Sequence, residues 1–204
     1  DIFILDITTE TDVSSFLCGV VDRVTKGVCI SGGSDLDFKK AILKAINESR
    51  SCIGFFSSGN TFVLPTGYKP FETKGILRNE RINLGKDGKH FENYVFLFSG
   101  ERKNFSDFKK TEYKFEDKRE EFDFLLKRLK EKGFQEIYRY VSKDERLEKL
   151  GYFVVRIIVP KLYQLYLRED HALTSSLRLD EFNLWKNKKS EFEISDDMVT
   201  MNNF

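Results

Sequence analysis

Residues 31–50 read SGGSDLDFKKAILKAINESR, and this stretch decides how the rest of the chain is interpreted. Its Gly/Ser run predicts a turn. Ser34 is the predicted N-cap of a helix, with Asp37 three residues later as in a capping box. Apolar side chains then recur every three or four residues, which is the spacing of one buried helical stripe: Phe38, Ala41, Ile42, Ala45 and Ile46. We therefore predict a helix that begins at the Ser34 cap.

The segments on either side of this helix have different patterns. Residues 1–30 carry β-branched residues in short runs separated by polar residues or glycine, which predicts two or three strands. Glycine and proline recur too often over residues 57–75 for long regular elements, so short strands and loops are expected there. Residues 90–99 are apolar enough to be buried, but the run is too short to distinguish a helix from a strand.

A second helix is predicted over residues 117–132. Its apolar residues are spaced to form one stripe: Phe122, Leu125, Leu126 and Leu129. Gly133 supplies the left-handed residue that commonly follows a helix. Residues 134–141 and 152–159 are rich in β-branched and aromatic residues and are joined by a charged turn, so they predict two strands, the second ended by Pro160.

Together these elements predict an α+β fold with a mixed β-sheet and at least two packed helices. Beyond about residue 182 the composition turns polar and no core periodicity continues. We therefore predict one domain over residues 1–182 and a polar C-terminal tail or arm over residues 183–204.

Charge, hydropathy and cysteine content narrow the class of protein. The 204-residue chain has 34 Lys plus Arg and 33 Asp plus Glu, so its net charge of +1 provides no broad field to attract nucleic acid or anionic lipid. The longest apolar run, residues 152–159, is interrupted by Arg156 and is too short to cross a bilayer. The three cysteines are well separated, which argues against a disulfide framework and a thiolate zinc site. We expect a cytoplasmic protein that binds neither nucleic acid nor membrane.

Local sequence offers few candidates for chemistry. The Gly/Ser run at residues 31–34 could present amides to a phosphate, but it matches neither a Walker loop nor a dinucleotide turn, so an ordinary turn and cap is favoured. Glu48 could hold magnesium, although a surface pair with Lys44 four residues earlier is the simpler interpretation. His90 and His171 have no neighbouring ligands or nucleophile motif, so neither a histidine metal centre nor nucleophilic catalysis is indicated.

The order of these pieces resembles the second half of a YcaO domain. The Gly/Ser run is followed by a helix of the form A-x-x-x-A-x-x-E, here residues 41–48. The helix over residues 122–132 with the glycine after it resembles the family's L-x-x-L-x-x-x-G stretch. Residues 150–160, LGYFVVRIIVP, resemble its strand-Pro signature. The resemblance covers roughly residues 1–180.

The resemblance implies an ATP-dependent enzyme that modifies a peptide backbone. In this family a Cys, Ser or Thr side chain adds to the preceding amide, the oxyanion is phosphorylated by ATP, and a thiazoline or oxazoline ring forms. It implies ATP and magnesium as cofactors, with Glu48 as the magnesium ligand and Ser34 and Gly33 near phosphate, while no catalytic residue is identified. The implied partners are a precursor peptide, as in bacteriocin biosynthesis, and a protein that delivers its leader peptide, with a homodimer as a further assembly.

The chain also departs from the family pattern. Ser51 stands where the helix usually has Gln, and Lys44 stands where a small polar residue is common. The N-terminal half that supplies further ATP contacts and the Pro-rich ending of many azoline-forming members are not in this sequence. Two explanations stay open. The chain is part of an active cyclodehydratase, or it is a diverged member that serves the same pathway as a non-catalytic docking or peptide-binding scaffold.

Overall fold

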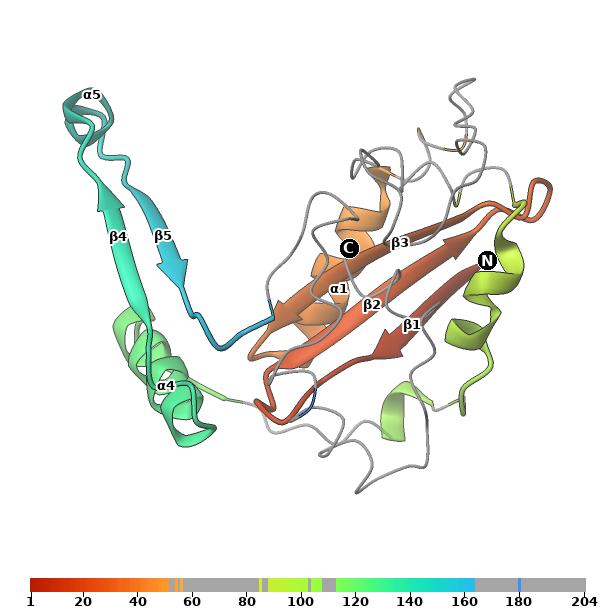
Figure 1. Ribbon diagram of the computed structural model, residues 1–204, viewed down its shortest axis with the longest axis horizontal. Helices are drawn as coiled ribbons and strands as arrows, with labels where there is room; N and C mark the ends of the chain where they lie inside the picture. The colour runs from red at the N-terminus through yellow and green to blue at the C-terminus, as the bar shows by residue number, and fades with distance from the viewer. Residues whose placement is uncertain are drawn as a thin grey trace. The chain divides into compact units, whose positions relative to one another are not determined.

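The computed structural model describes residues 1–51, 54, 56, 85, 88–102, 104–107, 113–163 and 180 (Figure 1). The chain divides into two compact units, one built on residues 1–114 and the other on residues 115–164. Three predictions concern residues outside the described ones: the loops over residues 57–75, the position of His171, and the tail over residues 183–204.

The sheet of the first unit consists of three antiparallel strands in the order β1-β2-β3: β1 (Ile2–Asp6), β2 (Ser14–Val21) and β3 (Val28–Asp35). Its register places Phe16 opposite Gly33 and Val21 opposite Val28. The prediction of two or three strands at the start of the chain is confirmed, although β3 continues to Asp35 and so includes the whole Gly/Ser run.

Two helices pack against this sheet. The helix α1 (Phe38–Ser49) forms one core cluster with β2: Phe16, Cys18, Phe38, Ala41 and Ala45. The 3-10 helix η1 (Phe91–Phe98) forms another with β2 and β3: Val21, Val28, Ile30 and Tyr94. Because successive side chains of a strand point to opposite faces, the two clusters lie on opposite faces of the sheet. A shorter 3-10 helix, η2 (Phe105–Asp107), follows along the chain.

The start of α1 differs from the prediction. The N-cap is Asp37, not Ser34, and its side chain accepts hydrogen bonds from the backbone N–H groups of Lys39 and Lys40. Ser34 instead pairs with Ser15 of β2, because the sheet provides hydrogen bonds for backbone groups that a turn leaves to solvent. Aspartate caps a helix as well as serine does, so α1 begins three residues later than predicted.

The second unit is a helix followed by a hairpin with a short helical connection: α4 (Lys118–Glu131), β4 (Tyr138–Ser142), α5 (Glu145–Lys149) and β5 (Val154–Ile158). Asp117 caps α4, and Gly133 follows the helix with a φ of 89°. β4 and β5 pair in antiparallel orientation. The second helix, the helix-strand-turn-strand order and the α+β class are therefore confirmed.

Two expectations from the sequence concerned disulfide bonds and membrane-spanning segments. Cys18 is free and buried, but Cys29 is disulfide-bonded, which differs from the expectation drawn from cysteine spacing. Spacing alone misses such a bond because the fold brings distant residues together. Within the described part of the chain, no helix has both the length and the apolar character needed to cross a bilayer.

Tyr94 gives the fold a measurable pH dependence. Its side chain is buried in the core cluster that η1 forms with β2 and β3. This burial raises the pKa of Tyr94 from its ordinary value of 10 to about 12. The unfolded chain loses this proton near pH 10, whereas the folded chain keeps it. The stabilising contribution is therefore complete below pH 10 and is lost as the pH rises to about 12.

We expect the free energy of unfolding to fall by about 2 to 3 kcal/mol across that interval on account of Tyr94. Urea denaturation at a series of pH values measures it. The Tyr94→Phe variant has no ionisable group there and should lack this part of the pH dependence. An equal slope in the variant would contradict the assignment.

Candidate functional site

Glu48 lies in the C-terminal half of α1, and its side chain turns toward the sheet. The residue is exposed, and its Oε2 accepts a long hydrogen bond of 3.4 Å from the backbone N–H of Gly32 in β3. Among the described residues, Oε1 has no hydrogen-bond partner. The carboxylate is therefore held near β3 while one of its oxygens stays open to a ligand.

Gly33 explains how α1 can lie so close to β3. A Cβ at this position would lie 2.8 Å from the Cβ of Lys44 and closer still to the carbonyl oxygen of Ala41 and the backbone nitrogen of Ala45. No side chain fits between the helix backbone and the strand. The glycine serves close packing rather than a turn, and this packing sets the height of Glu48 above the strand.

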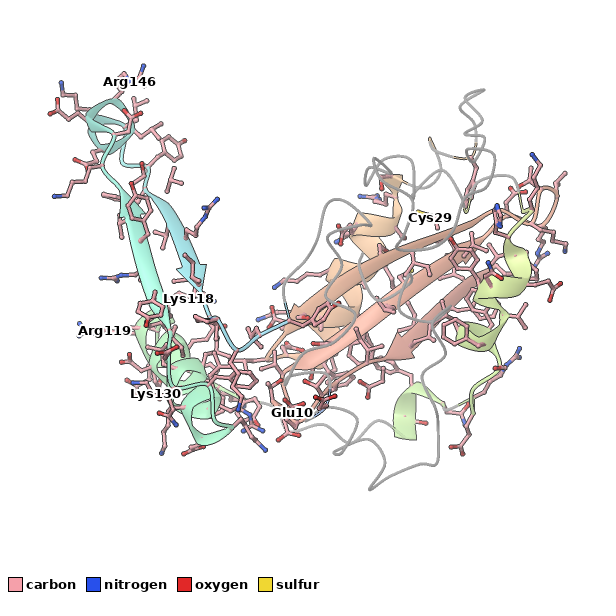
Figure 2. The ribbon with its side chains drawn as sticks, viewed as in Figure 1. Glu10, Cys29, Lys118, Arg119, Lys130 and Arg146 are labelled. Atoms are coloured by element: carbon pink, nitrogen blue, oxygen red, sulfur yellow. The ribbon has the colours of Figure 1, made fainter. Side chains whose placement is uncertain are left out.

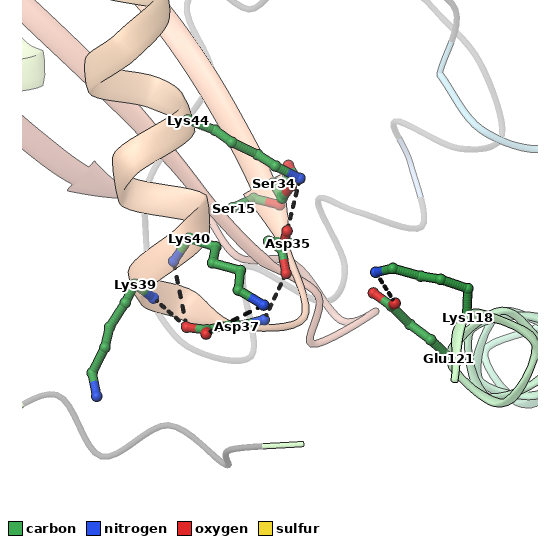
Figure 3. Close-up of polar contacts among 9 residues, drawn as sticks. All are labelled: Ser15, Ser34, Asp35, Asp37, Lys39, Lys40, Lys44, Lys118 and Glu121. Atoms are coloured by element: carbon green, nitrogen blue, oxygen red, sulfur yellow. Dashed lines mark hydrogen bonds and ion pairs between the residues drawn. The ribbon is translucent and has the colours of Figure 1, made fainter. Parts of the chain in front are cut away.

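Lys44 lies one turn before Glu48 on α1, and its side chain is held by Ser34 and Asp35 of β3 (Figure 3). Its Nζ lies 2.7 Å from Oδ2 of Asp35 and donates to the carbonyl oxygen of Ser34 at 3.1 Å. The expected i, i+4 surface pair between Lys44 and Glu48 is therefore not formed. Because a lysine has three N–H donors, one remains for a further acceptor.

The Asp35 carboxylate anchors this lysine. Its side chain is only 16% exposed, and burial by itself raises its pKa. The hydrogen bond and charge of Lys44, together with the N–H of Asp37, outweigh burial and hold the pKa of Asp35 below its ordinary value of 3.8. Asp35 is thus ionised at neutral pH, and its ion pair holds the Lys44 side chain in place.

Ser34 is placed differently from Glu48. Its hydroxyl lies 2.8 Å from that of Ser15 in β2 (Figure 3), and strand alternation puts both on the face opposite α1. The first N–H groups of α1 could donate to a phosphate only if Asp37 were displaced, because its carboxylate already accepts from those of Lys39 and Lys40. Of the predicted site residues, Glu48 is bound by the amide of Gly32, Gly33 lies against the backbone of α1, and Ser34 contributes only its carbonyl oxygen, which accepts from Lys44.

We call the strip formed by Gly32, Gly33, Lys44 and Glu48 the α1–β3 seam. It offers one carboxylate oxygen and one cationic N–H, carried by two residues that stand four positions apart on α1. Magnesium commonly binds to one or two carboxylates together with phosphate oxygens and water, so Glu48 suits a magnesium ion that arrives with a nucleotide. The described residues contain no cluster of three or more metal-ligating side chains, so nucleotide and water would complete the coordination.

Sequence reasoning missed the Asp35–Lys44 pair. The two residues are nine positions apart across a strand-to-helix junction, a distance at which no helical spacing rule applies. Asp35 is an acidic residue just before the helix and so was a possible partner for Lys44. Recognising it required knowing that β3 continues to Asp35. His90 lies at the N-terminal end of η1 and its side chain makes no capping hydrogen bond there.

Comparison with known families gives a match that covers most of the chain. A family model described as YcaO cyclodehydratase, ATP- and Mg2+-binding, matches residues 1–163. A search of curated proteins found no match to the chain. The matched range contains both the α1–β3 seam and the β4–β5 hairpin.

Proposed function

Since the chain belongs to the YcaO cyclodehydratase family, we propose that it forms part of an enzyme that uses ATP and magnesium to close rings on a ribosomal precursor peptide. The side chain of a Cys, Ser or Thr residue adds to the carbonyl carbon of the preceding amide. The amide oxygen then receives the γ-phosphoryl group of ATP. Loss of that oxygen as phosphate, with the amide proton, leaves a thiazoline or oxazoline. Such chemistry depends on positioned charge more than on a protein nucleophile.

The observation that carries the proposal is the position of Glu48, which turns to β3 and leaves one carboxylate oxygen open. Glu48 would hold magnesium, whose role is to neutralise charge on the phosphates of ATP. Lys44, positioned by Asp35, would donate to a phosphate oxygen one helical turn away. Gly33 and the backbone of Ser34 shape the surface that the phosphates approach.

The Glu48→Gln substitution tests this role. Glutamine has nearly the same shape but no charge, so magnesium affinity should fall while the fold is kept. In the full-length protein with its precursor peptide, we expect ATP hydrolysis to drop about 100-fold and the magnesium concentration needed for half-maximal rate to rise.

The matched control is Glu92→Gln, the same chemical change at an exposed glutamate in η1. It should leave the rate unchanged, and circular dichroism should show that both variants are folded. Unchanged hydrolysis in Glu48→Gln would remove Glu48 from the mechanism.

A non-catalytic docking or peptide-binding scaffold of the same pathway is the second candidate. The observation in its favour is Ser51, which stands where the family usually has Gln and whose hydroxyl donates back to the carbonyl oxygen of Glu48. A scaffold would bind the precursor peptide but show no ATP hydrolysis even with Glu48 intact. A partner that delivers the leader peptide, a homodimer, and a cytoplasmic location belong to either version of the proposal.

A further inference from the structure

The β4–β5 hairpin is exposed on both of its faces (Figure 2). All five residues of β5 are exposed, as are four of the five in β4. Tyr140 is 62% and Val155 50% exposed, although they belong to opposite faces of the ribbon. Among the described residues of this unit, Phe134 is the only buried hydrophobic one. The hairpin thus presents apolar side chains in an arrangement that normally requires a covering partner.

Two arginines stand among these apolar side chains. Arg139 lies in β4 and Arg156 in β5, and neither strand contains an acidic residue. Within the described part of the chain, neither guanidinium forms an ion pair. Nearby charged residues do pair, as Arg146 does with Asp144 at 3.0 Å. The hairpin therefore carries unpaired positive charge as well as apolar surface.

The register distributes this charge over both faces. Arg156 lies opposite Tyr140, and Arg139 lies opposite Ile157. Facing residues of an antiparallel pair share one side of the sheet, so each face has one arginine beside apolar side chains. An added strand also presents alternate side chains to the two faces. A segment in which two residue types alternate therefore presents one type to the face of Arg156 and the other type to the opposite face.

The backbone provides the remaining contacts. β5 has β4 as its only neighbour among the described strands, so its other edge has N–H and C=O groups that no described strand pairs. Such an edge binds extended polypeptides by strand addition.

We propose that the outer edge of β5 binds an extended polypeptide segment in which acidic and apolar residues alternate. The backbone of the segment pairs with β5, its acidic side chains lie on the face that carries Arg156, and its apolar side chains cover Val155 and Ile157 on the other face. This binding site lies in a different unit from Glu48 and goes beyond the proposed ATP-dependent activity. It is tested without ATP.

The test uses the wild-type chain and a fluorescein-labelled peptide of alternating glutamate and valine, about eight residues long. Fluorescence anisotropy should show saturable binding that weakens as salt is added. The same peptide with glutamine in place of glutamate should bind at least about tenfold more weakly. A version with N-methyl groups on alternate amides should not bind, because it cannot form a strand ladder.

Charge reversal locates the site on the protein. Arg156→Glu should weaken binding of the acidic peptide by at least about tenfold. Lys149→Glu, the same change of charge sign at an exposed residue of α5, should have little effect. Equal binding of the glutamine or N-methylated peptide would overturn the proposal, and these comparisons hold even if Arg156→Glu fails to fold. Absence of peptide binding together with dimerisation that Arg156→Glu abolishes would assign the edge to a second copy and also overturn it.

Discussion

Replacement of Gly33 by alanine is expected to lower the free energy of unfolding by about 3 kcal/mol. The added methyl carbon would overlap the carbonyl oxygen of Ala41 and the backbone nitrogen of Ala45. These are backbone atoms inside a helix, so they cannot rotate away as a side chain would. Relief requires α1 to move off β3, which removes contacts from the cluster around Phe16.

Gly100→Ala is the matched control, because a Cβ at Gly100 meets nothing within 4 Å. Its effect should stay within about 0.5 kcal/mol. Urea denaturation of both variants measures the difference. If Gly33→Ala were as stable as Gly100→Ala, the close packing of α1 on β3 would be wrong. Under the proposed function, Gly33→Ala should also raise the KM for ATP, because Glu48 and Lys44 belong to the displaced helix.

The interior of α1 was predictable from sequence, and its start was not. A stripe of apolar residues at helical spacing is a local signal, and it identified the residues that pack on Phe16. The start of the helix depended on whether residues 31–34 form a turn or pair with β2. The Gly/Ser run favours a turn by composition, but pairing with β2 draws Ser34 into a strand, and Asp37 then takes the cap. The register of a sheet is set by contacts distant in sequence, so no local rule could decide it.

The same limit applies to the candidate site. Carboxylate chemistry made Glu48 a candidate magnesium ligand, a family resemblance then favoured that role, and i, i+4 spacing predicted a pair with Lys44. In the structure, Lys44 forms an ion pair with Asp35, and the Glu48 carboxylate accepts a hydrogen bond from the backbone N–H of Gly32. Spacing rules assume that a helix face meets water, whereas this face lies along a strand that supplies its own charged and polar groups.

The hairpin shows a third kind of limit. β-branched and aromatic residues predicted both strands of the second unit correctly. Composition of this kind also predicts burial on at least one face. Instead both faces are exposed, and Arg139 and Arg156 interrupt the apolar surface on each side. The local pattern predicts the strands, but it does not determine whether either face of the hairpin is covered.

Replacement of Phe16 by alanine is expected to cost about 4 kcal/mol of unfolding free energy. Phe16 is 1% exposed, lies opposite Gly33 in the sheet, and packs beneath α1 with Ala41 and Ala45. Ala41 and Ala45 are small, so the Phe16 ring supplies much of the apolar volume that these two helix positions contact. Alanine there leaves a cavity that the rigid contact of α1 with Gly33 cannot close.

Phe16→Leu provides the comparison, because it retains most of the apolar volume. We expect it to cost about 1 kcal/mol, measured by urea denaturation beside Phe16→Ala. Equal losses in the two variants would mean that the ring does not support α1. The position of Glu48 depends on the same packing, through Gly33 and the helix above it. Under the proposed function, Phe16→Ala should therefore weaken magnesium-dependent ATP binding at temperatures where the variant is still folded, whereas Phe16→Leu should preserve it.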